Sequence, residues 1–293
     1  MKISILVDNF VDVPKLKAEH GLSILIEFED ENILFDCGQS DIVLGNAEIM
    51  GIDLNKITKI ILSHGHYDHT GGLLSILKHL NKEIDVYAHP SIFSEKFSRC
   101  GDFHKAGADS ISVISNISGT ERVDRYIGIP EKRAIYEQVG ARFLLISEPE
   151  EISRNIFFSG QISKIDEEIS DDNLYTWANG IYTIDPLQDD ISVFIKLQET
   201  LAVITGCAHS GILNILGRAI ELNPGFKKIA IIGGLHFSKK DDLYIDNIIS
   251  ELKKYSIELF VPMHCTGVDS YVKLKNEFGC KCLAGAVGKV LKF

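Results

Sequence analysis

The sequence feature that most constrains this chain is a histidine-rich loop between a short apolar run and a helical pattern. The run Lys59–Ser63 has the length of a strand, and the residues from His64 to His69 then read His-Gly-His-Tyr-Asp-His. Side chains two residues apart in an extended stretch point to the same side, so His64 and His66 can bind one ion. The turn at Asp68 and His69 directs a carboxylate and another imidazole to a neighbouring position. The loop therefore predicts one or two divalent metal ions, and zinc, iron and manganese all suit these ligands.

Short apolar runs bounded by turn residues recur along the chain and predict an α/β, layered fold. The expected strands are Ile3–Val7, Leu22–Phe28, Asn32–Asp36, Lys59–Ser63, Asp85–Ala88, Arg142–Ile146, Ile191–Leu197, Leu201–Gly206, Lys228–Ile232 and Glu258–Pro262. Helical patterns occupy Gly71–Leu80, Ile212–Glu221, Asp241–Tyr255 and Val268–Phe278. Because the first three strands are close in sequence, we expect an antiparallel or mixed sheet.

Composition and charge restrict the class of protein. With 293 residues, 45% of them hydrophobic, and a mean hydropathy of +0.08, the chain can form a buried core. The formal net charge of −11 disfavours nucleic-acid partners and anionic membrane surfaces. No apolar run approaches the roughly 18 residues of a membrane span, and the first residues lack a signal-peptide pattern. We therefore expect a cytoplasmic protein with reduced cysteines, and the oligomeric state stays open.

Residues 91–180 differ from the rest of the chain in their mixed charge and few apolar runs. We interpret them as an insertion or cap within one domain spanning residues 1–293, because no low-complexity or proline-rich linker separates them. Long insertions of this kind usually cover functional sites. The segment carries cations that could bind a small anionic substrate: Arg99, Lys105, Arg122, Arg125, Lys132 and Arg133.

Two later apolar runs also end in groups that bind metals. Leu201–Gly206 is followed by Cys207 and His209, and Glu258–Pro262 is followed by His264. One loop rarely completes a catalytic site, so we expect further ligands from these strand ends. Free cysteine is commonly just a small buried residue, which makes Cys207 a weaker candidate than the two histidines.

These motifs together resemble the metallo-β-lactamase-fold superfamily. The resemblance rests on Asp36 at the end of an apolar run, on the metal loop and on the later strand-terminal histidines. Five blocks resemble one branch of it, which contains the archaeal 7,8-dihydropterin-6-yl-methyl-4-(β-D-ribofuranosyl)aminobenzene-5′-phosphate synthase and many metal-dependent hydrolases: Glu19–Ser23, Ser63–Gly72, Gly206–Gly211, Gly233–His236 and Pro262–Gly267. The resemblance implies an αββα sandwich with a metal site at one edge, between the two sheets.

The resemblance also implies a ligand set, from which this chain departs. It assigns two histidines to a first metal, His64 and His66, and three groups to a second metal, Asp68, His69 and His264. The usual third histidine is missing, and residues 186–190 stand in its region. Where the superfamily carries a bridging aspartate after glycine, this chain has Cys207, with His209 two residues later. Either His209 replaces the missing histidine, or Cys207 binds, or the second metal is weak; we favour His209.

Three further residues are expected to support the site. The resemblance implies that Asp36 accepts a hydrogen bond from a metal-binding histidine, with a simple turn cap as the alternative. Asp190 is expected either to play a similar supporting part or to be an ordinary turn residue. His236 follows a fourth apolar run and is expected to reach the substrate and take part in catalysis, with a structural histidine as the alternative.

The expected reaction is hydrolysis of a small anionic ester or phosphoester. A metal-bound hydroxide would attack, and Asp68 would orient the nucleophile or accept its proton. The alternative is transfer, as in the synthase of this branch, where a pterin is joined to an aminobenzene phosphate with loss of diphosphate. Oxygen chemistry at iron is disfavoured because the loop has His66 where flavodiiron proteins usually carry glutamate. Metal content and a substrate screen would separate these reactions.

Overall fold

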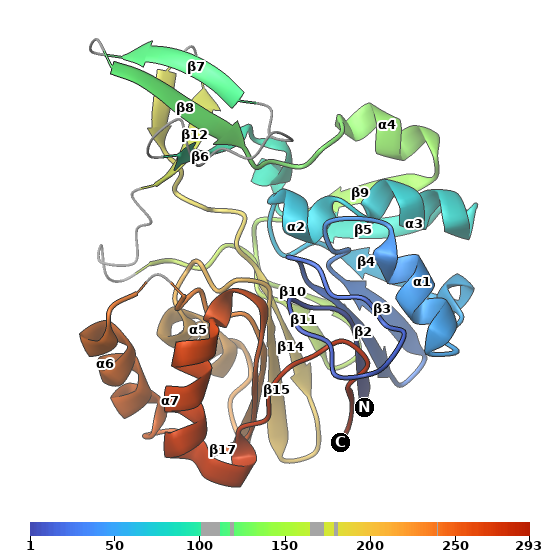
Figure 1. Cartoon of the computed structure of the whole chain (residues 1–293). Helices are drawn as coiled ribbons and strands as arrows, with labels where there is room; N and C mark the ends of the chain where they lie inside the picture. Colours follow the sequence, from blue (N-terminus) through green and yellow to red (C-terminus); the bar gives the residue numbers. More distant parts are fainter. Residues whose placement is uncertain (101–111, 118–119, 165–172, 179–180, 239) are drawn as a thin grey trace.

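The computed structural model describes residues 1–100, 112–117, 120–164, 173–178, 181–238 and 240–293. It contains two large sheets that face each other and a third, smaller sheet (Figure 1). The expected strands and helices are present, with their ends displaced by at most three residues. No helix in the described part of the chain is long and apolar enough to cross a lipid bilayer.

The first large sheet has seven strands and mixed topology. Its strands are β1 (Lys2–Val7), β2 (Ser23–Phe28), β3 (Glu31–Phe35), β4 (Lys59–Ile61), β5 (Ile84–Ala88), β9 (Ala141–Leu145) and β18 (Val290–Lys292), in the order β18-β1-β2-β3-β4-β5-β9. β18, β1, β2 and β3 pair antiparallel, and β3, β4, β5 and β9 pair parallel. The expected mixed sheet is therefore confirmed.

The second large sheet has six strands. They are β10 (Glu150–Ser153), β11 (Ile156–Phe158), β14 (Ser192–Lys196), β15 (Thr200–Thr205), β16 (Lys228–Gly233) and β17 (Ile257–Pro262), in that spatial order. β15, β16 and β17 run parallel, so the groups that follow them lie at the same edge of the sheet.

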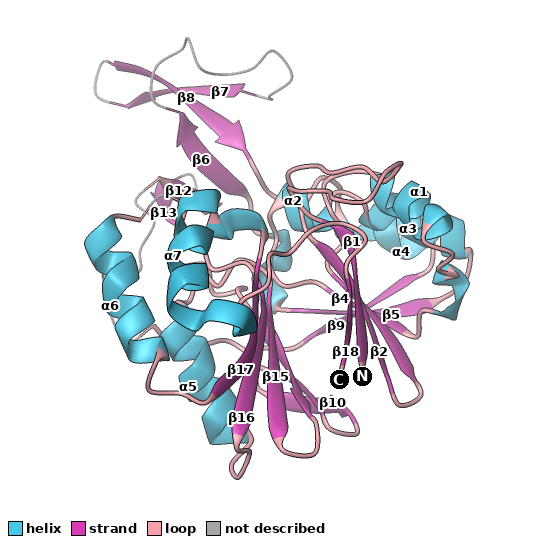
Figure 2. Cartoon of the chain, turned by 60° about the horizontal axis from the view of Figure 1, so that its bottom comes forward, coloured by secondary structure: helices cyan, strands magenta, loops and turns pink. Residues whose placement is uncertain are grey.

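Helices cover the outer face of each large sheet (Figures 1 and 2). The first sheet is covered by α1 (Ile42–Ile49), α3 (Leu73–Leu80) and α4 (Arg133–Gln138), and the second by α5 (Ile212–Leu222), α6 (Asp242–Leu252) and α7 (Val268–Phe278). Short helical turns occupy α2 (Tyr67–Thr70), η1 (Leu54–Lys56), η2 (Pro90–Phe93), η5 (His264–Thr266) and η6 (Gly279–Lys281). The layer order is α, β, β, α, which confirms the expected sandwich.

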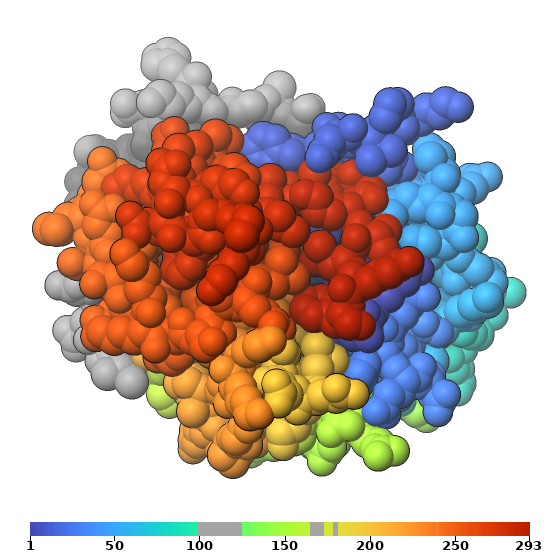
Figure 3. All heavy atoms as spheres, turned by 90° about the horizontal axis from the view of Figure 1, so that it is seen from below, coloured from blue at the N-terminus to red at the C-terminus, as the bar shows by residue number. Residues whose placement is uncertain are grey.

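Alternation along the strands explains these layers. In the first sheet Ile24 and Ile33 pack against the second sheet, whereas Leu25 and Leu34 pack under the helices. A strand sends successive side chains to opposite faces, so a strand that is apolar throughout must be covered on both sides. Figure 3, seen from below, shows the orange and red second half beside the blue first half. There the C-terminal β18 pairs with β1.

The third sheet is antiparallel and projects from the sandwich on the side of the histidine-rich loop (Figures 1 and 2). Its strands are β6 (Lys96–Cys100), β7 (Ser112–Ile117), β8 (Thr120–Tyr126), β12 (Leu174–Ala178) and β13 (Ile181–Ile184), in the order β13-β12-β6-β8-β7. The projecting sheet does not coincide with the expected 91–180, because α4, β9, β10 and β11 within that range belong to the sandwich, and β13 extends to Ile184. β10 and β11 escaped prediction because one is polar and the other has only three residues.

Candidate metal centre

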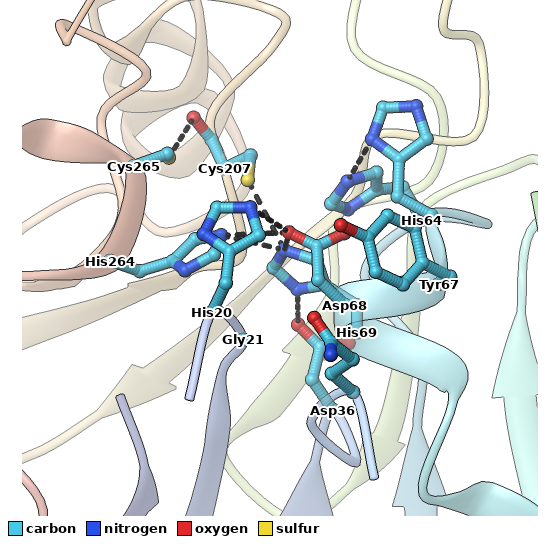
Figure 4. Close-up of polar contacts among 12 residues, drawn as sticks. His20, Gly21, Asp36, His64, Tyr67, Asp68, His69, Cys207, His264 and Cys265 are labelled. Carbon is cyan, nitrogen blue, oxygen red and sulfur yellow. Dashed lines mark hydrogen bonds and ion pairs between the residues drawn. The ribbon is translucent and has the colours of Figure 1, made fainter. Parts of the chain in front are cut away.

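Four strand ends from the two facing sheets meet at one edge of the sandwich. Figure 4 shows residues that follow three of these strands, β4, β15 and β17. β4 leads into the loop that carries His64 and His66, and α2 then presents Asp68 and His69. From the second sheet, β15, β16 and β17 lead to three further groups of residues, at Cys207 to His209, at His236 and at His264. All six predicted ligands are buried and come together here.

Three imidazoles form the first group. His64 Nε2 lies 2.9 Å from His66 Nδ1. The ring of His209 lies 4.9 Å from that of His64 and 5.1 Å from that of His66, measured between centroids. His209 therefore stands beside the other two rings, as expected if it replaces the missing histidine.

The second group combines a carboxylate with two imidazoles. His69 Nε2 lies 3.2 Å from His264 Nε2, and Asp68 Oδ2 lies 3.3 Å from the same His264 atom. Asp68 Oδ2 also lies 3.2 Å from Nε2 of His20, a half-exposed residue that sequence reasoning left unassigned. The signal for His20 was its place in the Glu19–Ser23 block.

Cys207 lies between the two groups. Its Sγ is 3.2 Å from His69 Nε2, and it lies within 4.8 Å of ligand atoms on His64 and His209 as well as on His69 and His264. The residue is 3% exposed. The sequence left open whether His209 or Cys207 is a ligand. The structure brings both residues to the site.

Asp36 holds the metal loop in place. Its Oδ2 lies 2.7 Å from Nδ1 of His69 and accepts a hydrogen bond of 2.7 Å from the Ser63 hydroxyl, while its Oδ1 accepts from the Ser63 amide at 2.7 Å. Gly206 makes this approach sterically feasible, because a Cβ there would lie 2.1 Å from Ser63 Oγ. Asp36 thus contacts a predicted ligand in the way that the resemblance implies.

Asp8 and Asn9, which follow β1, hold His264 in place. The backbone amide of His264 donates to Asp8 Oδ1 at 2.8 Å, and its Nδ1 lies 2.9 Å from Asn9 Oδ1. These contacts leave Nε2 facing Asp68 and His69. Asp8 and Asn9 were not among the residues expected at the site, and their polarity directly after the apolar run Ile3–Val7 was the signal available.

Asp190 and His236 also lie at the site. Asp190 is buried, and its Oδ2 accepts a 2.7 Å hydrogen bond from the amide of Ser210, next to His209. The ring of His236 lies 4.3 Å from that of His209. The Nδ1 or Nε2 of His236 falls within 4.8 Å of the thiols of Cys207 and Cys265.

A buried ion cluster joins the insertion to the metal loop, and sequence reasoning missed it. Lys96, at the start of β6, is 1% exposed, and its Nζ lies 2.8 Å from Asp185 Oδ2 and 2.8 Å from Asp189 Oδ1. The other oxygen of Asp189 accepts a 2.8 Å hydrogen bond from the amide of Gly65, between two predicted ligands. Burial lowers the pKa of Lys96, but the two carboxylates outweigh it and raise that pKa above its ordinary value.

The surroundings give the histidines different protonation states. Burial lowers the pKa of His64, His66 and His209 well below 6.5, and neighbouring imidazoles lower it further. Burial also disfavours a charge on His69, but the carboxylates of Asp36 and Asp68 raise its pKa to about 9. The first three are therefore neutral at pH 7, which is the form that binds metals.

The donor set fits divalent metal ions. Nε2 of His66 and Nε2 of His209 are buried, and no group in the described ranges hydrogen-bonds either atom. A buried polar atom without a partner is unfavourable, and a metal ion that accepts the electron pair of such a nitrogen removes this penalty. Imidazole, carboxylate and thiol are all ligands of zinc-like ions.

A cavity of about 370 Å³ opens over these groups. It is lined by His66, Asp68, His209 and His264, and on the insertion side by Tyr67 and Arg125 among others. The guanidinium of Arg125 lies 5.0 Å from the centre of the Tyr67 ring and donates to its hydroxyl at 3.1 Å.

Comparison with known proteins identifies the fold family. The family model of the metallo-beta-lactamase superfamily matches residues 16–208, which contain the metal loop and Cys207. The chain belongs to the metallo-beta-lactamase superfamily. It is 32% identical to the 7,8-dihydropterin-6-methyl-4-(beta-D-ribofuranosyl)-aminobenzene-5'-phosphate synthase of Methanocaldococcus jannaschii over 286 residues, covering 94% of this chain and 90% of the relative.

Solved structures agree with this placement in the superfamily. A metal-dependent hydrolase of the beta-lactamase superfamily has 29% sequence identity and a TM-score of 0.80, over 100% of this chain and 99% of that chain. The Zn(2+)-bound PqqB of Methylobacterium extorquens shares the fold, with a TM-score of 0.53 and 12% identity, over all of both chains. The expected resemblance to the metallo-beta-lactamase superfamily is thus confirmed.

Of the cations expected on the insertion, the structure brings Arg125 to the cavity. Lys132 and Arg133 are exposed beside α4, and Arg133 pairs with Glu137 in the same helix. Lys105 lies outside the described residues, as do the side chains of Arg99 and Arg122.

Proposed function

We propose that this protein is a metal-dependent hydrolase that acts on a small anionic ester or phosphoester. The observation that carries the proposal is the convergence of imidazole and carboxylate groups from four strand ends on one cavity. One divalent ion would be held by His64, His66 and His209, and another by Asp68, His69 and His264, with zinc preferred over iron or manganese. Such ions, when bound, polarise an ester or phosphoryl oxygen and lower the pKa of water toward about 7.

Asp68 is the carboxylate that we assign to proton transfer. Burial raises its pKa, but the charge of His69 and hydrogen bonds from His20 and His264 outweigh burial and hold that pKa well below the ordinary value. The carboxylate is therefore ionised at neutral pH, and its Oδ2 can orient a water molecule or accept its proton. His236, which also lines the cavity, is proposed to contact the leaving part of the substrate.

Arg125 supports the choice of an anionic substrate. Guanidinium has five N–H donors, and the structure uses one of them on the Tyr67 hydroxyl. The contact with the Tyr67 ring and hydroxyl holds the guanidinium at the cavity, and such a group can make bidentate contact with a phosphate or a carboxylate. We therefore expect the insertion to select the substrate and the sandwich to bind the metal.

A second candidate is transfer with loss of diphosphate. It is favoured by the 32% identity to the M. jannaschii synthase, which extends over most of both chains. In that reaction the residues of the site would assist the departure of diphosphate, and water would have to be kept out.

Metal analysis combined with a substrate screen tests the proposal. We expect one or two ions per chain and turnover of at least one phosphomonoester, phosphodiester, lactone or thioester that stops on chelation. Turnover that survives complete metal removal would refute the proposal. Release of diphosphate from a dihydropterin diphosphate only when an aminobenzene phosphate is present, with no hydrolysis of either, would establish transfer instead.

We also propose a domain organisation, a compartment and a class of partner for this protein. We propose one domain, supported by the pairing of β18 with β1. We propose a reducing, cytoplasmic compartment, supported by the free thiols of the five cysteines that the structure describes. We propose that the protein binds a small molecule and that it binds neither nucleic acid nor a membrane.

A further inference from the structure

One thiol is common to the two groups of ligands in this site. The ligand atoms of His64, Cys207 and His209 lie within 4.8 Å of one another, and so do those of His69, Cys207 and His264. Two ligands of one zinc-like ion are separated by no more than roughly twice the 2.0–2.3 Å metal–ligand distance. Cys207 Sγ therefore satisfies this spacing for two ions at once, one on each side of it.

The groups around the thiol point to a ligand and not to simple packing. Cys207 follows β15 and faces buried nitrogens, with His69 Nε2 at 3.2 Å. His209, two residues along the chain, has a ring nitrogen within 4.8 Å of the thiol, and no group in the described part of the chain hydrogen-bonds its buried Nε2. A cysteine that served only as a small apolar residue would be expected against carbon atoms, not within a ring of imidazoles.

The second thiol of the site is placed differently. Cys265 is within 4.8 Å of Cys207 and His236 but belongs to neither of the two histidine groups. Its Sγ accepts a hydrogen bond from the His236 amide at 3.2 Å and lies 3.7 Å from the carbonyl oxygen of Cys207. The two thiols also contact each other, but Cys265 lies outside both histidine groups, so replacing each cysteine in turn shows which sulfur binds the ions.

We propose that the thiolate of Cys207 bridges two metal ions in this centre; the proposal rests on the metal site of the proposed function. Binding forms two metal–sulfur bonds, and the thiol proton is released to solvent. A bridging thiolate favours soft or borderline ions, so the centre takes zinc, cobalt or iron in preference to magnesium or manganese.

Cobalt(II) titration of the metal-free, full-length protein tests this inference without recourse to activity. We expect two Co²⁺ ions per chain and a sulfur-to-cobalt charge-transfer absorption in the near ultraviolet that grows through both equivalents. The second equivalent should also attenuate the electron paramagnetic resonance signal of the first, because a shared sulfur couples the two ions.

Variants identify the sulfur. Cys207→Ser should lose the charge-transfer absorption and bind the second ion more weakly, by more than the roughly 10- to 100-fold that loss of a supporting partner produces. Cys265→Ser should keep the absorption. Cys207→Asp, which restores a bridging group of different chemistry, should recover two ions without the absorption and so excludes misfolding as the cause.

Three results would overturn the inference. The first is two bound ions without sulfur absorption in the wild-type protein, and the second is loss of the absorption in Cys265→Ser with retention in Cys207→Ser. The third is an absorption complete at one equivalent with no coupling between the ions, which would make Cys207 a ligand of one ion. Failure of the wild-type protein to bind Co²⁺ at all would instead refute the proposed metal centre.

Discussion

Several residues at the site hold backbone conformations that L-amino acids seldom adopt. Asp36, Ala208, His236 and His264 have φ values of 58°, 56°, 54° and 54°. Each such residue is unfavourable by about 1–3 kcal/mol unless its surroundings hold it. Because they all follow strands that end at the metal edge, the stable sandwich supports this strain where the chain turns to present its ligands.

Loss of one loop imidazole should remove metal and turnover together. We expect His64→Ala or His66→Ala to weaken metal binding at least roughly 100-fold, since these rings are proposed ligands and loss of a supporting partner alone produces 10- to 100-fold. Metal content, turnover and circular dichroism are the measurements. His79→Ala, on the exposed face of α3, is the control and should leave all three unchanged. Wild-type metal content in His64→Ala would contradict the ligand assignment.

The raised pKa of His69 predicts how stability of the metal-free protein depends on pH. The folded pKa of about 9 exceeds the ordinary value of 6.5, so the folded protein holds this proton more tightly than the unfolded chain. The contribution of His69 is therefore complete below pH 6.5 and is lost as the pH rises to about 9. Urea unfolding of chelator-treated protein between pH 6 and 9 should show this fall, and His69→Gln should flatten it. An equal slope in both proteins would assign the fall to other groups.

At the scale of elements, β6 is connected to the metal loop through the buried carboxylate of Asp189. Lys96 supplies the positive charge for two buried carboxylates, one of which holds the amide of Gly65. Removal of one partner of a buried ion pair leaves an uncompensated charge. The insertion thereby stabilises the loop that carries His64 and His66.

Lys96→Met should consequently destabilise the protein by about 3–5 kcal/mol. The measurement is the free energy of unfolding in urea, with metal content determined on the same samples. The control is Lys253→Met, because Lys253 and Glu277 form an exposed pair whose loss should change stability by less than about 1 kcal/mol. Equal effects of the two substitutions would show that the buried cluster contributes no more than a surface pair.

At the scale of the whole molecule, the sandwich and the projecting sheet have separate tasks in the proposed function. The predicted metal ligands come from the sandwich, whereas Arg125 comes from β8 of the third sheet. Replacing Arg125, which lines the cavity but contacts none of the predicted ligands, should therefore alter substrate binding more than metal binding.

Arg125→Gln tests this division of tasks. We expect KM for an anionic substrate to rise roughly 10- to 100-fold, as loss of a charge-assisted hydrogen bond of about 1.5–3 kcal/mol requires. Metal content and KM for a neutral ester should not change. Arg133→Gln, which removes an exposed charge on α4, is the matched control. An unchanged KM in Arg125→Gln would place the selecting wall elsewhere.

The sequence by itself determined the elements and the central loop, because local periodicity and the short His64–His69 motif carry their own structural meaning. The layer order also followed, since strands that are apolar on both faces must be covered on both. Only the tertiary structure decided which distant groups meet. Lys96 contacts Asp189, which is 93 residues away in the sequence, and Cys207 contacts His69, which is 138 residues away.

Neither of these two contacts can be recognised from the residues next to it in the sequence. A buried lysine and an exposed one look alike in a sequence, and a cysteine after a strand looks the same whether it packs against carbon or lies between imidazoles. Their roles depend on which strand ends share an edge, and that is set by the packing of two sheets against each other. The extent of the insertion was decided in the same way, by the pairing of β11 with β14.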